Sequence, residues 1–318
     1  MKSPELEPVS RTDTDSPRQA SKTVKRIFVG PQGLRTGWRI LLFWLIFAAV
    51  LVPAHWIMKG WVGASPASMK SIPPSLLLLV ESVLFTAMAV ATCAIAAVER
   101  RSPFAYGLRD RAGARRLASG IASGFVAISV LVAVLWSAGF VHLSAGESHG
   151  AGALKNGLVW ALAFLAVGLV EELTFRGYFQ QALARKIGFG WATLLTSVLF
   201  GAIHATNQGE TAVGLAQAMA FGFIACFSLW YTGSLWWVIG CHAGWDWGQS
   251  FVYGVRDSGL QVQGALLSAQ PAGNVWLSGG NTGPEGSLLV VPVLVAMAAL
   301  MWLRWRREGS EFVRLQTQ

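Results

Sequence analysis

Long runs of apolar residues alternate with short polar stretches over most of the chain. An α-helix needs ~20 mostly apolar residues to cross a hydrocarbon core of ~30 Å, and several runs meet that requirement. The pattern predicts an all-α, polytopic membrane protein with about eight transmembrane helices and no soluble domain. The predicted spans are 38–58, 75–98, 118–140, 157–184, 188–206, 212–232, 234–251 and 286–303.

The composition agrees with lipid as the solvent. Hydrophobic residues make up 53% of the 318 residues and charged residues only 13%, against ~25% charged in soluble domains. Cys93, Cys226 and Cys241 all lie in apolar runs. Their spacing suggests neither a disulfide framework nor a metal site.

Basic residues are concentrated in alternate loops. In a soluble protein the net charge of +9 would suggest nucleic acid. Here the excess lies in the N-terminal tail, the loop after the second span, the turn after the fourth and the C-terminus. Such positions set the topology, so no nucleic-acid partner is expected. The alternation predicts a multi-pass protein of the cell membrane with both termini in the cytoplasm, and an even number of spans requires the same.

The order of these segments divides the chain into four parts. Residues 1–34 are predicted to be a disordered basic cytoplasmic tail, since they are rich in Ser, Thr, Pro, Lys and Arg. Residues 35–150 hold the N-terminal transmembrane helices. Residues 151–305 form a transmembrane core that contains the polar motifs described next, and 306–318 form a second cytoplasmic tail.

The first polar motif interrupts the fourth span. An ionisable group inside an apolar helix costs roughly 2.5–3.5 kcal/mol and persists where it is paired or used. Glu172 and Arg176 are four residues apart with the acid first, which is the favourable order for a helical ion pair. Glu171 points ~100° away and has no local cation. We therefore expect Arg176 to neutralise Glu172 and leave Glu171 available, although a purely structural ion pair is the alternative.

Two histidine motifs follow in later spans. His204 lies near the end of the fifth span, and His242 and Asp246 share one face of the seventh. An ionised Asp246 could fix the tautomer of His242. The alternatives are a core histidine and a polar pair between helices. A rise of ~1.5 Å per residue places Glu171 and His204 at similar depth, so the acid and both histidines are expected to converge in a polar cavity. Glu81, near the end of the second span, is expected to be solvated.

These three motifs, in this order, resemble the CPBP family of CAAX-processing and bacteriocin-processing intramembrane proteases, also called the Abi family. The family pattern is Glu-Glu-x-x-x-Arg, then Phe-x-x-x-His, then His-x-x-x-Asn or Asp. In this chain the corresponding residues are Glu171, Glu172 and Arg176, then Phe200 and His204, then His242 and Asp246. The segment 279–286 is similar to a loop of bacterial members. The resemblance covers roughly residues 155–290.

The resemblance implies hydrolysis of a peptide bond inside the membrane. It implies that Glu171 is the base and that His204 holds the same water. His242 and Asp246 would assist the oxyanion, and Arg176 would position or neutralise Glu172. The implied partners are the lipid bilayer and a peptide or protein substrate, with prenylated C-termini and bacteriocin precursors both open.

Two features of the chemistry stay open. An ionised Asp246 is an acceptor only, whereas an Asn there would be a neutral donor; Asp246 could be protonated, could orient His242 or could bind a metal. A bound Zn²⁺ would have Glu171, His204, His242 and Asp246 as ligands. The metal-free mechanism is preferred, because no close-spaced ligand pair resembles an ordinary zinc site.

Two other functions compete with a protease. Buried acids and histidines also serve as proton relays in proton-coupled transporters, but the inverted repeats of many transporters are not visible in the sequence. The third possibility is a non-catalytic immunity or scaffold protein on the same fold. No phosphate-binding glycine loop, His-Glu-x-x-His motif or serine elbow is found.

Overall fold

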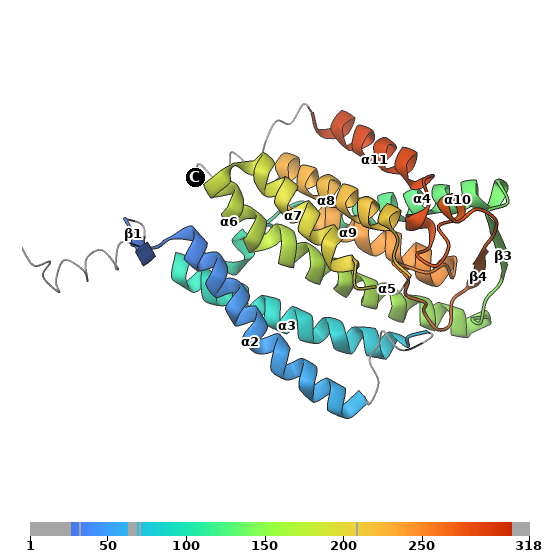
Figure 1. Cartoon of the computed structure of the whole chain (residues 1–318), viewed down its shortest axis with the longest axis horizontal. Helices are drawn as coiled ribbons and strands as arrows, with labels where there is room; N and C mark the ends of the chain where they lie inside the picture. Colours follow the sequence, from blue (N-terminus) through green and yellow to red (C-terminus); the bar gives the residue numbers. More distant parts are fainter. Residues whose placement is uncertain (1–26, 32, 63–68, 70, 208, 307–318) are drawn as a thin grey trace, which may run out of the picture.

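The computed structural model describes residues 27–306, apart from residues 32, 63–68, 70 and 208. It is a helical bundle whose helices run mostly along the long axis of the molecule (Figure 1). Among the described residues, five helices are long and apolar enough to cross a membrane: α2 (Thr36–Val62), α3 (Pro74–Glu99), α4 (Gly113–Ser137), the continuous α5–α6 (Gly150–Ile187) and α8 (Ala212–Thr232). The other three predicted spans correspond to the shorter helices α7 (Phe189–His204), α9 (Trp236–Asp246, extended by η4) and α11 (Val290–Trp305). The predicted all-α polytopic fold is confirmed.

The fourth span is longer than predicted. Helix α5 (Gly150–Glu172) continues through the π-helical segment η3 (Leu173–Gly177) into α6 (Tyr178–Ile187), which gives a span of 38 residues. The predicted start at residue 157 is wrong, because Lys155 and Asn156 interrupt the apolar run although the helix continues through them.

Short strands accompany the helices. Strands β3 (Val141–Ala145) and β4 (Leu267–Pro271) pair antiparallel at the end of the bundle away from α6 (Figure 1). Strands β1 (Val29–Gly30) and β2 (Gly33–Leu34) form a small hairpin before α2. The predicted tails 1–34 and 306–318 lie largely outside the described residues; within the first, the structure has this hairpin where disorder was expected.

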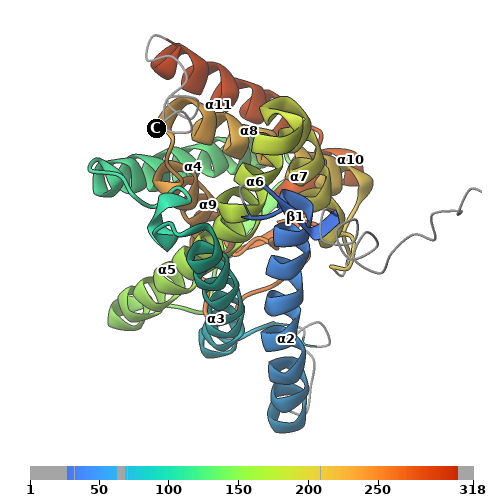
Figure 2. The ribbon, with the colours of Figure 1, turned by 90° about the vertical axis from the view of Figure 1, so that its left-hand side faces the viewer.

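Helix α9 lies centrally and packs closely against α4 (Figure 2). A Cβ atom on Gly240 or Gly244 would collide with the carbonyl oxygens of Leu117 and Ile121 on α4. Small residues at such a crossing let two backbones approach, so Gly240 and Gly244 permit the close contact between α9 and α4. This contact holds α9, which carries His242 and Asp246, firmly in the bundle.

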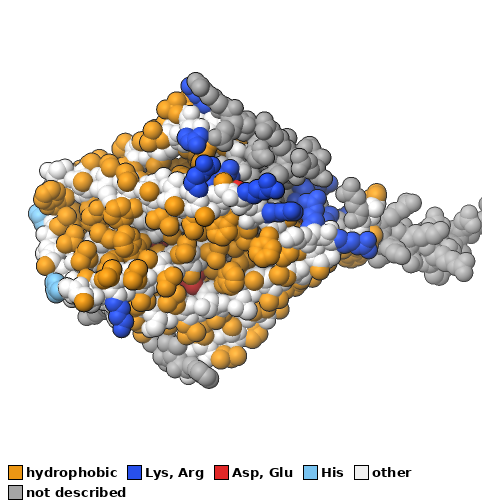
Figure 3. All heavy atoms as spheres, turned by 180° about the vertical axis from the view of Figure 1, so that it is seen from behind, with side chains coloured by type: hydrophobic (Ala, Val, Ile, Leu, Met, Phe, Trp, Pro, Cys, Tyr) orange, Lys and Arg blue, Asp and Glu red, His pale blue; other side chains and the backbone are white. Residues whose placement is uncertain are grey.

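Arginine and lysine side chains gather at one end of the molecule (Figure 3). The described ones on the elements of this end are Arg100, Arg101, Arg109, Arg111, Arg115, Arg116, Arg185, Lys186, Arg304 and Arg306. The end that carries β3 and β4 has only Lys59, Lys155 and Arg256 among the described residues. At the basic end, Glu99 pairs with Arg39 at 2.7 Å and with Arg185 at 3.4 Å, which ties α3 to α2 and α6.

Candidate active site

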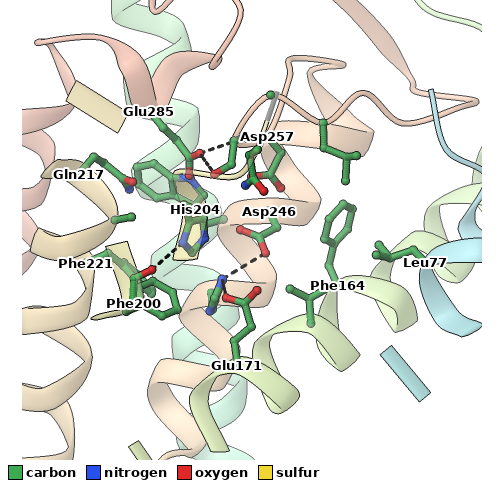
Figure 4. Close-up of a pocket in the computed structure, with 18 of the residues that line it drawn as sticks. Leu77, Phe164, Glu171, Phe200, His204, Gln217, Phe221, Asp246, Asp257 and Glu285 are labelled. Atoms are coloured by element: carbon green, nitrogen blue, oxygen red, sulfur yellow. Dashed lines mark hydrogen bonds and ion pairs between the residues drawn. The ribbon is translucent and has the colours of Figure 1, made fainter. Parts of the chain in front are cut away.

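A cavity of about 400 Å³ opens between the helices of the bundle (Figure 4). Helices α3, α5, α7, α8 and α9 supply its walls, and the loop residues 257–261 and Glu285 close one side. Its polar and charged lining residues are Glu81, Glu171, His204, Thr206, Asn207, Gln217, His242, Asp246, Asp257, Ser258, Gln261 and Glu285. Four of the predicted site residues, Glu171, His204, His242 and Asp246, therefore share one cavity, and the predicted convergence is confirmed.

The two adjacent glutamates have different environments. The Glu171 side chain retains 27% exposure and lines the cavity, whereas the Glu172 side chain is fully buried. Both lie at the end of α5, just before the π-helical turn of η3. Such turns are rare and often occur at functional sites, and η4 (Trp247–Val252) begins in the same way directly after Asp246.

Arg176 and Glu172 form a buried pair behind the cavity. Nη1 of Arg176 lies 3.3 Å from the Glu172 carboxylate, as the i, i+4 spacing predicted. The Arg176 guanidinium also lies 4.2 Å from the centre of the Phe200 ring, a favourable cation–π contact. Neither Arg176 nor Glu172 lines the cavity. Both were predicted to be catalytic, and the structure separates them from the space where a substrate would bind.

His242 links three carboxylates. Its Nδ1–H donates to Oε1 of Glu172 at 3.0 Å. Its Nε2 lies 3.7 Å from Oε2 of Glu171 and 3.5 Å from Oδ2 of Asp246. Carboxylates on both ring nitrogens favour the doubly protonated imidazolium, which donates from both positions.

His204 presents one ring nitrogen to the cavity. Its Nδ1–H donates to the carbonyl of Phe200, one turn earlier in α7, at 2.7 Å. This bond assigns the tautomer and leaves Nε2 as an acceptor. The dashed line from His204 to Phe200 in Figure 4 marks the contact.

Glu81 was missed. It was expected to be solvated near a span end, but α3 begins at Pro74, so Glu81 lies two turns inside the helix. It is 6% exposed and lines the cavity. The expectation was wrong because the distance to the span end does not reveal which face of the helix a side chain occupies. A carboxylate within an apolar run was the available signal.

Glu285 and Asp257 were also missed as cavity residues. Glu285 accepts hydrogen bonds from Nε1 of Trp245 at 3.1 Å and from the amide and hydroxyl of Ser258 at 3.1 and 3.0 Å. It therefore fastens the loop beside the cavity to α9. Burial, and then the neighbouring Asp246 and Glu285 carboxylates, raise the pKa of Asp257 well above its ordinary value. Asp257 lies in a loop and Glu285 in the short 3₁₀ helix η5 (Pro284–Gly286), so hydropathy does not predict where either side chain packs.

The donor geometry does not fit the proposed metal site. Among the described residues, no group of three or more His, Cys, Asp and Glu side chains is placed to hold a metal ion. Glu171, His204, His242 and Asp246 share the cavity without forming such a set. The chemistry below is therefore derived from the side chains alone.

One segment of the sequence matches a known protein family. Residues 153–248 match the family described as "Type II CAAX prenyl endopeptidase Rce1-like". This segment of the chain is therefore similar to the CAAX proteases. The match covers under a third of the chain but includes all three motifs, from Glu171 to Asp246. It supports the resemblance to CAAX-type intramembrane proteases in general. No curated protein and no solved structure matches the chain.

Proposed function

We propose that the chain is an intramembrane endopeptidase that hydrolyses peptide bonds with a water activated by Glu171 and His204. The observation that supports this most strongly is that Glu171, His204 and His242 line one cavity. Of the two adjacent glutamates, Glu171 is the one that reaches it. The family match agrees with the reaction class.

In the proposed first step, a water lies between the Glu171 carboxylate and Nε2 of His204. Both groups are acceptors, since Nδ1 of His204 carries the proton. They take the two hydrogens of the water and direct its lone pair toward the substrate carbonyl carbon. Glu171 removes one proton as the C–O bond forms, which is general-base catalysis within hydrogen-bond reach.

His242 then stabilises the tetrahedral intermediate. As an imidazolium it presents Nε2–H to the developing oxyanion, and a preorganised donor in a low-dielectric site is effective in this role. Glu172 holds Nδ1 and Asp246 balances the positive charge. The protonated Glu171 returns its proton to the leaving amine, and the C–N bond breaks to give an amine and a carboxylic acid.

Asp246 acts in this proposal as an acceptor that maintains the charge and orientation of His242. Its Oδ2 lies 3.5 Å from Nε2 of His242, and its side chain is 7% exposed. A donor role like that of an Asn would require a proton on Asp246. This proximity to the imidazole favours the orienting role among the three that the sequence left open.

The charge distribution indicates from which side of the membrane the substrate would enter. The basic end of the bundle would face the cytoplasm, together with both termini. Thr206, Asn207 and the loop 257–261, which line the cavity, lie toward the opposite end. The scissile segment would then approach from the non-cytoplasmic side. A secreted peptide precursor suits this approach better than a protein prenylated in the cytoplasm.

Membrane proteomics of cells that express the wild type or Glu171→Ala tests the function. The expected result is a set of membrane or secreted proteins that accumulate uncleaved in the variant. Identical protein termini in the two strains, with equal amounts of the folded enzyme, would contradict the proposal.

A further inference from the structure

The cavity has an acidic lining that the mechanism does not use fully. Its carboxyl groups are Glu81, Glu171, Asp246, Asp257 and Glu285, and no Lys or Arg is among its described lining residues. Most of these acids have partners: His242 lies beside Glu171 and Asp246, Trp245 and Ser258 donate to Glu285, and Ser250 donates to Asp257. Oε2 of Glu81, by contrast, has neither a hydrogen-bond donor nor a cation in contact with it among the described residues.

Glu81 places one carboxyl oxygen, Oε2, out of contact with water. The residue is 6% exposed, and its Oε2 has no hydrogen-bond partner among the described residues. A carboxyl oxygen removed from water costs free energy unless a donor replaces the lost hydration. Glu81 also lies within electrostatic range of Glu171, His242 and Asp246. A donor that reaches Glu81 would therefore lie close to the reacting groups.

The walls beside Glu81 suit an aliphatic chain with a charged tip. Leu77, one turn earlier in α3, and Phe164 and Val167 of α5 also line the cavity. Leu77 and Phe164 lie on one side of it, across from Phe221 and Gln217 of α8 (Figure 4). Lys and Arg place their methylene stems along apolar surface and present the charged group beyond it.

We propose that Glu81 forms a specificity subsite for a positively charged group of the substrate next to the scissile bond. The ligand would be the side chain of a Lys or Arg, or an N-terminal ammonium, bound by a charge-assisted hydrogen bond to the Glu81 carboxylate. The inference rests on the proposed peptidase function and adds the substrate class.

The test compares matched peptides cleaved by the purified enzyme in proteoliposomes. Three peptides differ only in carrying Lys, Gln or Glu at the position next to the cleaved bond, and mass spectrometry identifies that bond. For the wild type we expect kcat/KM to fall from the Lys to the Gln peptide by roughly 10- to 100-fold, with the Glu peptide poorer still. In Glu81→Gln the Lys-to-Gln ratio should collapse toward one, and Glu81→Asp should restore part of it.

The control is Glu147→Gln, which removes an exposed carboxylate at the same end of the bundle, outside the cavity. It should keep the wild-type ratio, since a general surface-charge effect would change both variants alike. A wild-type ratio near one, or an undiminished ratio in Glu81→Gln, would overturn the subsite while leaving the peptidase intact. If the wild type cleaves no peptide, binding of the Lys peptide decides: weaker binding in Glu81→Gln supports the subsite without the peptidase, and equal binding overturns it.

Discussion

His242 donates through Nδ1 to Glu172 at 3.0 Å, and Arg176 approaches the same carboxylate at 3.3 Å from the other side. Glu172 is thus the shared partner of one cation behind the cavity and one imidazole that lines it. Arg176 does not line the cavity, but by fixing the Glu172 carboxylate it also fixes the orientation of the His242 ring, which does.

The buried pair gives the first prediction. Glu172→Ala leaves the Arg176 charge buried without its partner, and such a change typically costs about 3–5 kcal/mol. We expect a clear fall in the thermal unfolding midpoint in detergent. The double variant Glu172→Leu with Arg176→Met removes both charges and should recover most of the stability, but not cleavage. A stable single variant would show that the pair does not hold the core together.

Gly222 gives a second prediction, on packing around Arg176. A Cβ at this position on α8 would lie 2.8 Å from Nη2 of Arg176 and 3.0 Å from Cα of Ser197. Overpacking of this kind typically costs about 1–3 kcal/mol, so Gly222→Ala should lower both stability and cleavage. Gly190→Ala on α7 is the matched control, because nothing lies within 4 Å of the added atom. Equal stability of the two variants would contradict the assigned position of Arg176.

The third prediction concerns pH. Burial, then Asp246 and Glu285, raise the pKa of Asp257 in the folded state, so the folded protein binds a proton that the unfolded chain releases. Stability should therefore fall as pH rises from the ordinary Asp pKa of ~4 toward the raised value. Asp257→Asn should flatten this decline in thermal unfolding measured from pH 5 to 9. If the stability of the variant falls with pH at the same slope, groups other than Asp257 cause the decline.

The fourth prediction tests sidedness. Asn207 is exposed and lines the cavity, and Arg101 is exposed at the basic end. In a Cys93→Ser background, which removes the exposed native thiol, a membrane-impermeant maleimide added to intact spheroplasts should label Asn207→Cys but not Arg101→Cys. Inside-out vesicles should give the reverse. Labelling of Arg101→Cys in intact spheroplasts would contradict the proposed orientation and indicate the opposite one.

Much of this architecture was predictable from sequence because lipid imposes one strong rule. Each predicted apolar run corresponds to a helix of the described residues, five of which are long and apolar enough to cross a membrane. The i, i+4 spacing predicted the Glu172–Arg176 pair. Depth along antiparallel helices was enough to bring Glu171 and His204 together.

The remaining features of the site could not be predicted, because they depend on how each helix is rotated about its axis and on how the loops fold. Hydropathy does not indicate which face of α3 Glu81 occupies, and it carries no information on where Asp257 and Glu285 fold back. The π-helical turns after Glu172 and Asp246 shift the helix faces in a way that a regular 3.6-residue period does not anticipate.

The central claim is that Glu171 activates the water that cleaves the substrate. The most direct test is the cleavage rate of a membrane-embedded reporter by purified wild type, Glu171→Gln and the Glu147→Gln control in proteoliposomes at equal amounts of folded enzyme. Loss of a general base should lower kcat by roughly 10²- to 10⁴-fold in Glu171→Gln, with Glu147→Gln close to wild type. Cleavage by Glu171→Gln at the wild-type rate would contradict the mechanism and assign the base to another group. No cleavage by the wild type itself would favour a transporter or a non-catalytic scaffold on this fold.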